Sequence, residues 1–273
     1  MRVRLILLAT AGLLTGCATL PPGPRDPRDP LERYNRSMYR FNDALDRHIA
    51  APLARGYVKV VPHPVRSGLG NFFNNLTYPT VIINDLLQGK LKAFASDTTR
   101  LVLNTTIGIG GLFDPASQLG LPAGDEDFGQ TLGKWGVPAG PYFVWPIAGP
   151  STIRDTVAWF PDQFTDPKTY VDPLALRLSL NAFNLFLERV EFLSSDDLVR
   201  RSYDPYVFIR NAYLKHREYV VKDGNVPPDE IELFEDEEMI EDDSATGEES
   251  TEAAEPADAA GDSAAPVPAD PAQ

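Results

Sequence analysis

The stretch GIGGLFDPASQLGLPAGDEDFGQTLGKWGVPAGPYFVWPIAG spans residues 108–149 and decides the fold. It holds ten of the 20 glycines of the chain, together with five prolines and six aromatic residues. Glycine permits positive φ angles and close approach of two backbones, and proline fixes turns. The stretch therefore predicts tight turns around a short helix at 125–135. Residues 142–147 are predicted to form a short strand or an extended apolar loop.

Helices are predicted on the N-terminal side of this stretch. Residues 29–49 carry apolar side chains at the helical period, with Asp29 as N-cap, Pro30 at the first position and Glu32 completing a capping box. Pro52 restarts a helix to about Val61, which Pro62 and Pro64 end because each proline restricts the residue before it. Further segments are expected at 65–76, at 80–88 after Pro79, and at 90–106.

The C-terminal side is also predicted to be helical. A helix begins near Ser151 and runs to about Phe160, and the most apolar long helix spans 173–193. Two more follow at 196–202 and 206–221, where Asp204 and Pro205 open the last one. Of the 25 prolines, 21 lie in residues 18–228, which excludes a long-helix bundle. The predicted fold class is mainly α, with short and medium helices joined by Pro/Gly turns.

The N-terminus carries the features of an export signal. Arg2 and Arg4 precede an apolar run of about ten residues, which is too short for a membrane-spanning helix of roughly 20. The only cysteine, Cys17, follows the small residue Gly16, and Leu14 to Cys17 resemble the bacterial lipoprotein signal. That resemblance implies cleavage before Cys17, a covalent diacylglycerol and N-acyl chain on it, and no other cofactor. An ordinary secretory signal with a stray cysteine is the alternative.

The residue after the cysteine bears on the destination of the protein. Ala18 stands there in place of aspartate, which in the lipoprotein sorting pattern implies the outer membrane. The Pro-rich residues 17–28 are predicted to be a spacer between the lipid and the body of the protein.

The net charge of −14 is concentrated in one segment. Residues 229–273 hold 17 Asp and Glu and no Lys or Arg, whereas residues 18–228 hold 23 basic and 22 acidic residues. The tail is therefore predicted to be disordered, as a solvated spacer or as a docking segment for a basic carrier surface. The nearly neutral body contains no basic patch, so nucleic acid is not an expected partner.

The residue types needed for catalysis are present but scattered. None of the three histidines stands at metal-ligand spacing from another, and the chain contains no G-x-S-x-G elbow. Ser151 follows a proline and is interpreted as a helix cap. The interpretation is a protein that is not an enzyme, with no catalytic residues and no metal site.

Motif blocks in the body occur in an order that resembles the MlaA (VacJ) lipoprotein family. The match runs in register over about 29–222, and the chain departs from the family pattern at Ala158, where a glycine is expected, and in its longer tail. The blocks are Asn35-Arg36, Met38-Tyr39, Phe41-Asn42, Leu45-Asp46, Pro62 to Leu76, Leu103-Asn104-Thr105, Asp127 to Gly133, Trp135-Gly136-Val137, Gly140-Pro141-Tyr142, Gly149 to Thr152, Arg154-Asp155 and Asp204-Pro205-Tyr206.

The resemblance implies a ring-like assembly of helices that lies in the periplasmic-side leaflet of the Gram-negative outer membrane. It implies a trimeric porin as partner and a polar channel that admits mislocalised phospholipids from the outer leaflet. A periplasmic MlaC-like carrier would receive them, so that lipid asymmetry is maintained. The expected division is a signal at 1–16, a leader at 17–28, an MlaA-like helical domain at 29–228 and the acidic tail at 229–273.

Candidates for channel lining or lipid contact come from the glycine-aromatic centre and from the first helix. In the first helix an apolar and a polar residue stand side by side, as a boundary between leaflet and channel would need, although a core residue beside a solvated or capping one is an equal alternative. The candidates are Phe41, Asn42, Gly110, Gly111, Phe128, Trp135, Gly140 and Tyr142.

Two other functions remain open at this point. The first is a lipoprotein that only scaffolds a porin or an envelope complex. The second is a periplasmic phospholipase, which would need chemistry from His63 or Ser151.

Overall fold

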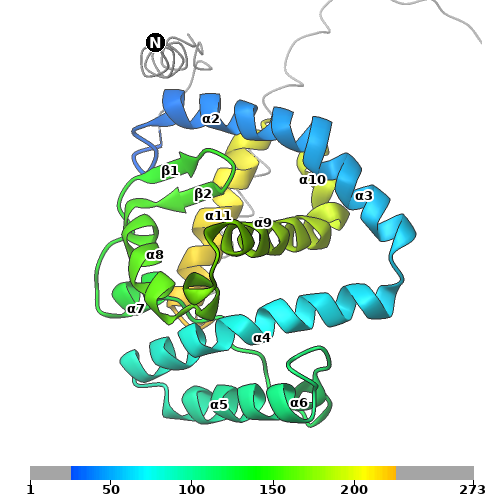
Figure 1. The fold of residues 1–273 in the computed structure, drawn as a ribbon. Coiled ribbons are helices and arrows are strands. Elements are labelled where there is room, and N and C mark those ends of the chain that lie inside the picture. The colour runs from blue at the N-terminus through cyan, green and yellow to red at the C-terminus, as the bar shows by residue number, and fades with distance from the viewer. Residues whose placement is uncertain (1–25, 226–273) are drawn as a thin grey trace, which may run out of the picture. The chain divides into compact units, whose positions relative to one another are not determined.

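A computed structural model describes residues 26–225 of the chain (Figure 1). The lipoprotein signal, Cys17, most of the Pro-rich leader and the acidic tail lie outside the described residues. Within the described part, the chain is mainly helical with one two-stranded sheet, which confirms the predicted fold class.

The first helices form one nearly continuous rod. Helix α2 (Glu32–Leu45) passes through a π-helical turn, η1 (Asp46–Ala50), into α3 (Ala51–Val60). The predicted break before Pro52 is absent. The amide of Ala51 donates to the carbonyl of Asp46, so the π turn takes up the change in hydrogen-bond register just before proline, which has no amide hydrogen.

Helix α4 (His63–Leu87) is one element where the sequence predicted two. Pro79 lies inside it and removes one backbone hydrogen bond, but the helix continues. Packing explains the continuity, because α4 lies along α5 (Leu91–Thr106) and also contacts α8 and α7 (Figure 1). Tertiary contacts of this kind outweigh a local helix breaker.

The glycine-rich stretch contains two short helices and strand β1, and strand β2 begins at its last residue. Helix α6 (Pro115–Gln118) was not predicted, whereas α7 (Phe128–Lys134) lies inside the predicted range. Strands β1 (Tyr142–Trp145) and β2 (Gly149–Thr152) pair antiparallel, with Tyr142 opposite Thr152. The helix predicted near Ser151 is present and begins at Ile153. The interpretation of Ser151 as its cap is wrong, because Ser151 belongs to β2 and Thr152 caps the helix by accepting a hydrogen bond from the amide of Asp155.

The remaining helices follow the predictions within a few residues at most ends. Helix α8 (Ile153–Thr165) runs past the predicted end at Phe160 and contains Pro161. It is followed by the 3-10 turn η2 (Pro167–Tyr170), α9 (Leu174–Glu191), the 3-10 turn η3 (Phe192–Ser195), α10 (Asp196–Arg201) and α11 (Pro205–Val221).

Packing contacts join these elements into a closed circuit. Helix α2 packs on β1, β1 pairs with β2, β2 contacts α8, and α8 contacts α4. The chain itself returns from α4 through α3 to α2, and α9 packs against α3 (Figure 1). The predicted ring-like arrangement of helices is therefore present among residues 26–225.

The apolar core is small and borders a buried polar network. Met38, Tyr142, Val144 and Tyr206 form the buried cluster. Beside it lies Asp29, which does not cap α2 as predicted, because the N-cap is Leu31 and makes no side-chain cap. Asp29 is buried and accepts hydrogen bonds from Asn35 (2.8 Å), Arg210 (3.2 Å) and the hydroxyl of Tyr206.

Candidate functional site

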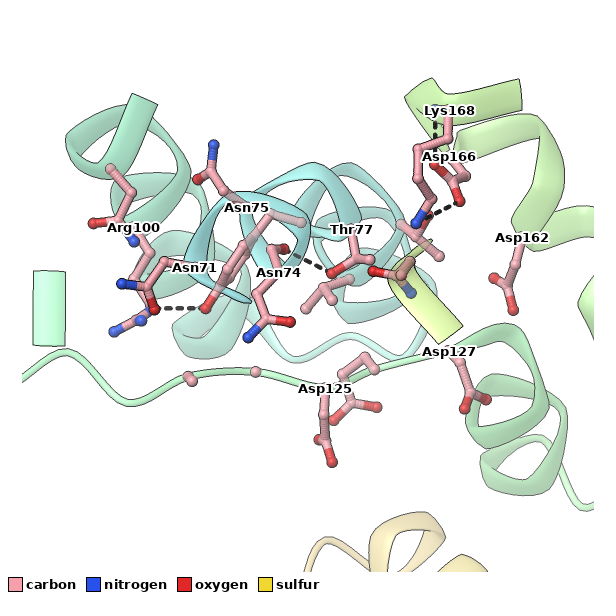
Figure 2. Close-up of a pocket in the computed structure, with 18 of the residues that line it drawn as sticks. Asn71, Asn74, Asn75, Thr77, Arg100, Asp125, Asp127, Asp162, Asp166 and Lys168 are labelled. Atoms are coloured by element: carbon pink, nitrogen blue, oxygen red, sulfur yellow. Dashed lines mark hydrogen bonds and ion pairs between the residues drawn. The ribbon is translucent and has the colours of Figure 1, made fainter. Parts of the chain in front are cut away.

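A cavity of about 720 Å³ lies between α4 and the segments that pack around it (Figure 2). Its walls come from α4, α5, the segment before α7, α8, η2 and α9. Most of the lining side chains are amides, hydroxyls and carboxylates. A second recess of about 300 Å³ adjoins it, because Asn71 and Asn74 line both.

Helix α4 supplies the amide wall of the cavity. Asn71, Asn74, Asn75 and Tyr78 stand three or four residues apart and therefore share one face of the helix. On another side of α4, Phe73 is buried and its ring lies 5.8 Å from that of Phe183 in α9. The helix is thus amphipathic, with its polar side facing the cavity.

Arg100 of α5 forms several hydrogen bonds at the end of the cavity that lies next to α6. Its guanidinium donates to the hydroxyl of Tyr78 (2.6 Å), to the carbonyl of Leu121 (2.5 Å) and to Asp114 (2.8 Å). All three guanidinium nitrogens have partners, since Ser117 accepts from two of them as well. Arg100 is therefore a structural cation that ties α4, α5 and α6 together.

Two lining carboxyl groups have raised pKa values. Burial raises the pKa of Asp162 to about 6, although its carboxylate accepts hydrogen bonds from the amide of Phe128 (3.1 Å) and from Asn84 (3.1 Å). Surrounding protein likewise raises the pKa of Glu188 in α9, which accepts from Asn184 (2.6 Å). Both groups lie at the end of the cavity formed by α8, η2 and α9.

A buried pair of carboxyl groups lies behind the cavity wall. Asp85 of α4 is fully buried and Asp97 of α5 is 2 % exposed. Burial and the neighbouring Asp97 raise the pKa of Asp85 to about 7, and burial also raises the pKa of Asp97. The amide of Gly124, a lining residue, donates to Asp97 (3.2 Å), so the pair supports the cavity from outside.

The predicted glycines lie in turns. Gly110 and Gly111 follow α5 with φ angles of 69° and 89°, which glycine adopts without strain. A Cβ atom on Gly111 would overlap the side chain of Asn75, so this glycine makes room for a lining residue. Gly140 has a φ angle of 71° beside Ile153 and lies away from the cavity lining.

The predicted aromatic residues do not line the cavity either. The rings of Phe128 and Trp135 meet edge to face at 6.1 Å, and the indole of Trp135 donates to the carbonyl of Leu87 (3.2 Å). Tyr142, proposed as a lipid contact, is 1 % exposed because it packs in the core cluster with Val144 and Tyr206.

The pair in the first helix has a specific neighbour. Phe41 is exposed, whereas Asn42 donates to the carbonyl of Trp145 (2.8 Å) and accepts from the amide of Ile147 (2.7 Å). Asn42 therefore holds the turn between β1 and β2.

None of the eight candidates is among the residues that line the cavity. The informative signal was the amide face of α4, since asparagines at 71, 74 and 75 recur at helical spacing in a segment already predicted to be helical. Asp162, Lys168 and Glu188 had no such signal, because the helices that carry them meet only in the tertiary structure.

The residues considered for catalysis form hydrogen bonds with nearby residues of the same elements or turns. Ser151 donates to the carbonyl of Thr152 (3.2 Å) and hydrogen-bonds the hydroxyl of Thr156 (3.0 Å). His63 sits in the first turn of α4 beside the hydroxyl of Ser67 (3.3 Å). Among residues 26–225, no group of three or more His, Cys, Asp or Glu could hold a metal ion. In the same range, no helix is both long and apolar enough to cross a membrane.

Known proteins are similar to this chain in sequence and in fold. The profile of the family described as MlaA lipoprotein matches residues 27–220. The intermembrane phospholipid transport system lipoprotein MlaA of Escherichia coli K12 is 37 % identical over 237 residues, which cover 84 % of this chain and 93 % of that protein. The protein of the same description from Haemophilus influenzae is 34 % identical, covering 83 % of this chain and 94 % of that protein.

A solved structure agrees with the sequence comparison. It is described as the structural basis for maintenance of bacterial outer membrane lipid asymmetry, and it superimposes with a TM-score of 0.66 at 34 % identity. The aligned region covers 72 % of this chain and 100 % of the solved chain. The chain therefore belongs to the MlaA lipoprotein family.

Proposed function

We propose that this chain is the lipoprotein of an intermembrane phospholipid transport system and that phospholipid headgroups pass through the polar cavity. The observation that carries the proposal is the cavity of about 720 Å³, which is lined mainly by amides, hydroxyls and carboxylates. A phospholipid has a polar headgroup that needs hydrogen-bond partners, and such partners are absent from the hydrocarbon of a bilayer.

Apolar side chains on the outside of the helices support the same function. Many large hydrophobic residues are exposed on α8, η2 and α9, including Phe160 (59 %), Phe164 (74 %), Tyr170 (68 %) and Leu178 (59 %). An exposed apolar surface of this kind is typical of contact with membrane or with another protein. A polar interior with an apolar exterior suits a protein placed within one leaflet.

The finer features of the proposal follow the family. Cys17, acylated, would hold the protein at the outer membrane, and the body would lie in the periplasmic-side leaflet. Mislocalised phospholipid would enter from the outer leaflet beside a trimeric porin and leave to a periplasmic MlaC-like carrier. The outcome would be maintained lipid asymmetry, without a catalysed reaction.

The test is the phospholipid content of the outer leaflet in cells that lack the protein, carry it, or carry a blocked cavity. Asn74→Trp fills the space shared by the two recesses, and we expect it to raise outer-leaflet phospholipid toward the level of the deletion. Asp197→Asn, an exposed change on α10, serves as the control and should behave as the wild type. Immunoblots must show equal amounts of each variant.

Two results would contradict the proposal. Normal outer-leaflet lipid in the deletion, with a porin still co-purifying with the protein, would favour a scaffold. Release of fatty acid from phospholipid by the purified protein, lost on changing His63 or Ser151, would favour a phospholipase.

A further inference from the structure

The side chains that line the cavity carry more negative than positive charge. Its lining contains seven carboxylates and two cations. Most of the carboxylates have cationic partners, since Asp114 pairs with Arg100 (2.8 Å), Asp166 with Lys168 (3.2 Å), Glu126 with Lys90 (2.7 Å) and Asp127 with Arg217 (2.5 Å). Asp125, Asp162 and Glu188 form no ion pair within residues 26–225, and of these three Asp162 and Glu188 lie at the end of the cavity formed by α8, η2 and α9.

An indole lies beside one of these carboxylates. Trp159 and Asp162 are three residues apart on α8, both line the cavity, and Trp159 is 56 % exposed. Side chains at this spacing lie on the same face of a helix. A carboxylate next to an accessible indole face is the combination that binds an organic ammonium group, through charge and through cation–π attraction.

A cation lies at the same end of the cavity. Lys168 is 5 % exposed and its ammonium pairs with Asp166, and its positive charge partly offsets the rise that burial causes in the pKa of Glu188. Figure 2 shows Lys168, Asp166 and Asp162 together at one end of the cavity. Positive and negative side chains therefore stand next to one another there, as a zwitterion would require.

The opposite wall provides an independent sign that a ligand belongs in the cavity. Asn75 lines it and is 7 % exposed, and its side-chain oxygen Oδ1 has no hydrogen-bond donor. A buried acceptor without a donor costs free energy, about 1–3 kcal/mol. A ligand that brings N–H or O–H groups into the cavity would satisfy it.

We propose that the end of the cavity formed by α8, η2 and α9 is a subsite for zwitterionic phospholipid headgroups of the phosphatidylethanolamine type. Lys168 faces the phosphate, while Asp162 and Glu188 face the ammonium group against the indole of Trp159. The inference rests on the proposed function and specifies its substrate class. A phosphatidylglycerol headgroup has the phosphate but lacks the cation, so the two unpaired carboxylates disfavour it.

The experiment measures which lipid the protein retains. Full-length acylated protein is purified in detergent micelles that contain equal amounts of phosphatidylethanolamine and phosphatidylglycerol, and bound lipid is identified by native mass spectrometry at pH 8. We expect the wild type to enrich phosphatidylethanolamine over phosphatidylglycerol. The double variant Asp162→Asn/Glu188→Gln should lower that ratio roughly tenfold, as the loss of about 1.4 kcal/mol in relative affinity would produce.

Single variants separate the two halves of the subsite. Lys168→Met should weaken retention of both lipids and leave their ratio unchanged, because both carry the phosphate. Glu188→Gln alone should lower the ratio and guards against misfolding at Asp162, whose carboxylate accepts the amide of Phe128. Asp197→Asn on α10 is the control and should retain the ratio of the wild type.

Each contrary outcome has a distinct meaning. Equal retention of both lipids by the wild type, or an unchanged ratio in the double variant, overturns the subsite but leaves lipid transport standing. Failure of the wild type to retain either lipid overturns the proposed function. O-phosphoethanolamine should displace phosphatidylethanolamine, and equal displacement by free ethanolamine would overturn the headgroup subsite in favour of a simple amine site.

Discussion

Asp85 and Asp97 place two carboxyl groups side by side in the interior. Two ionised carboxylates only accept hydrogen bonds, so the oxygens of Asp85 have no donor when both are charged. Burial disfavours the charged form of Asp85, and one shared proton allows an O–H···O bond to Asp97, so the pKa of Asp85 rises to about 7. The pair is therefore most stable with a single proton.

This pair makes the stability of the protein depend on pH. The pKa of Asp85 in the folded state is about 7, above roughly 3.9 in an unfolded chain. Between these values the folded state binds more protons, so the contribution of Asp85 to the free energy of unfolding is complete below about pH 4 and is lost as the pH rises through 7.

We predict that Asp85→Asn raises the free energy of unfolding by about 2–4 kcal/mol at pH 8 and by less than half as much at pH 5. The reason is that an amide donates to the Asp97 carboxylate at every pH. Urea denaturation followed by tryptophan fluorescence at the two pH values measures the effect. Asp197→Asn is the exposed control, and an equal gain at pH 5 and pH 8 would contradict the explanation.

Single residues were predictable from the sequence where their role is local. Asp204 caps α11 as predicted, since its carboxylate accepts hydrogen bonds from the amides of Tyr206 and Val207, the second and third residues of the helix. Asp29 fits an N-cap pattern equally well, yet it binds Asn35, Arg210 and Tyr206 instead. Two of these partners lie about 180 residues away, so no local pattern could have revealed them.

At the scale of elements, the β1–β2 hairpin depends on a side chain of α2. Asn42 binds Trp145 at the end of β1 and Ile147 in the middle of the turn, and Ile147 has a positive φ angle of 70°. A β-branched residue is strained in that conformation. The two hydrogen bonds of Asn42 therefore hold a turn that the local sequence disfavours.

We predict that Asn42→Ala lowers the free energy of unfolding by about 1–3 kcal/mol, because two backbone groups of the turn lose their partner. It should also increase hydrogen exchange of the Ile147 amide. Chemical denaturation and exchange mass spectrometry measure the two effects. Arg40→Ala, an exposed change on the same helix, is the control, and unchanged exchange at the turn would contradict the role of Asn42.

Most helices were predictable because their ends carry capping residues, prolines or glycines and their apolar residues recur at the helical period. The exceptions have tertiary causes. Pro79 marked a break in the sequence, but α4 is held along its length by α5, α7 and α8. Strand β2 was missed because Gly149, Pro150 and Ser151 have low strand propensity, and its pairing with β1 creates the strand.

At the scale of the whole protein, buried polar residues are as prominent as buried apolar ones. Within residues 26–225, 15 polar or charged residues are buried and 12 apolar residues are buried. Helix α11 is attached mainly through such groups, since Arg217 binds Asp127 and Asp155 (3.0 Å) while Tyr213 donates to Asp155 (2.8 Å). These contacts connect α11 to α7 and α8.

We predict that Arg217→Met destabilises the protein by about 2–3 kcal/mol, because Asp127 loses its cation and Asp155 keeps only its ion pair with Arg154 (3.0 Å). The comparable change Arg200→Met removes an exposed ion pair of 3.6 Å with Asp196 and should cost less than about 1 kcal/mol. Urea denaturation of both variants measures the difference. Equal effects would show that the buried network contributes no more than a surface ion pair.

The cavity belongs to this scale and could be predicted only in part. The resemblance implied a polar channel, and the asparagines of α4 could have been assigned to it from their spacing. Lys168 lies on η2 and Glu188 on α9, and their proximity to Asp162 depends on how α8 and α9 pack. That packing rests on many weak contacts, which have no short sequence signature.

The large apolar side chains exposed on α8, η2 and α9 have a calorimetric consequence. The heat-capacity increment of unfolding arises chiefly from apolar surface that becomes hydrated, and polar surface reduces it. A chain that buries few apolar and many polar residues gains little newly hydrated apolar surface when it melts. Its stability curve should therefore be shallow, so that the free energy of unfolding changes slowly between refrigeration and growth temperature and cold denaturation lies far below freezing.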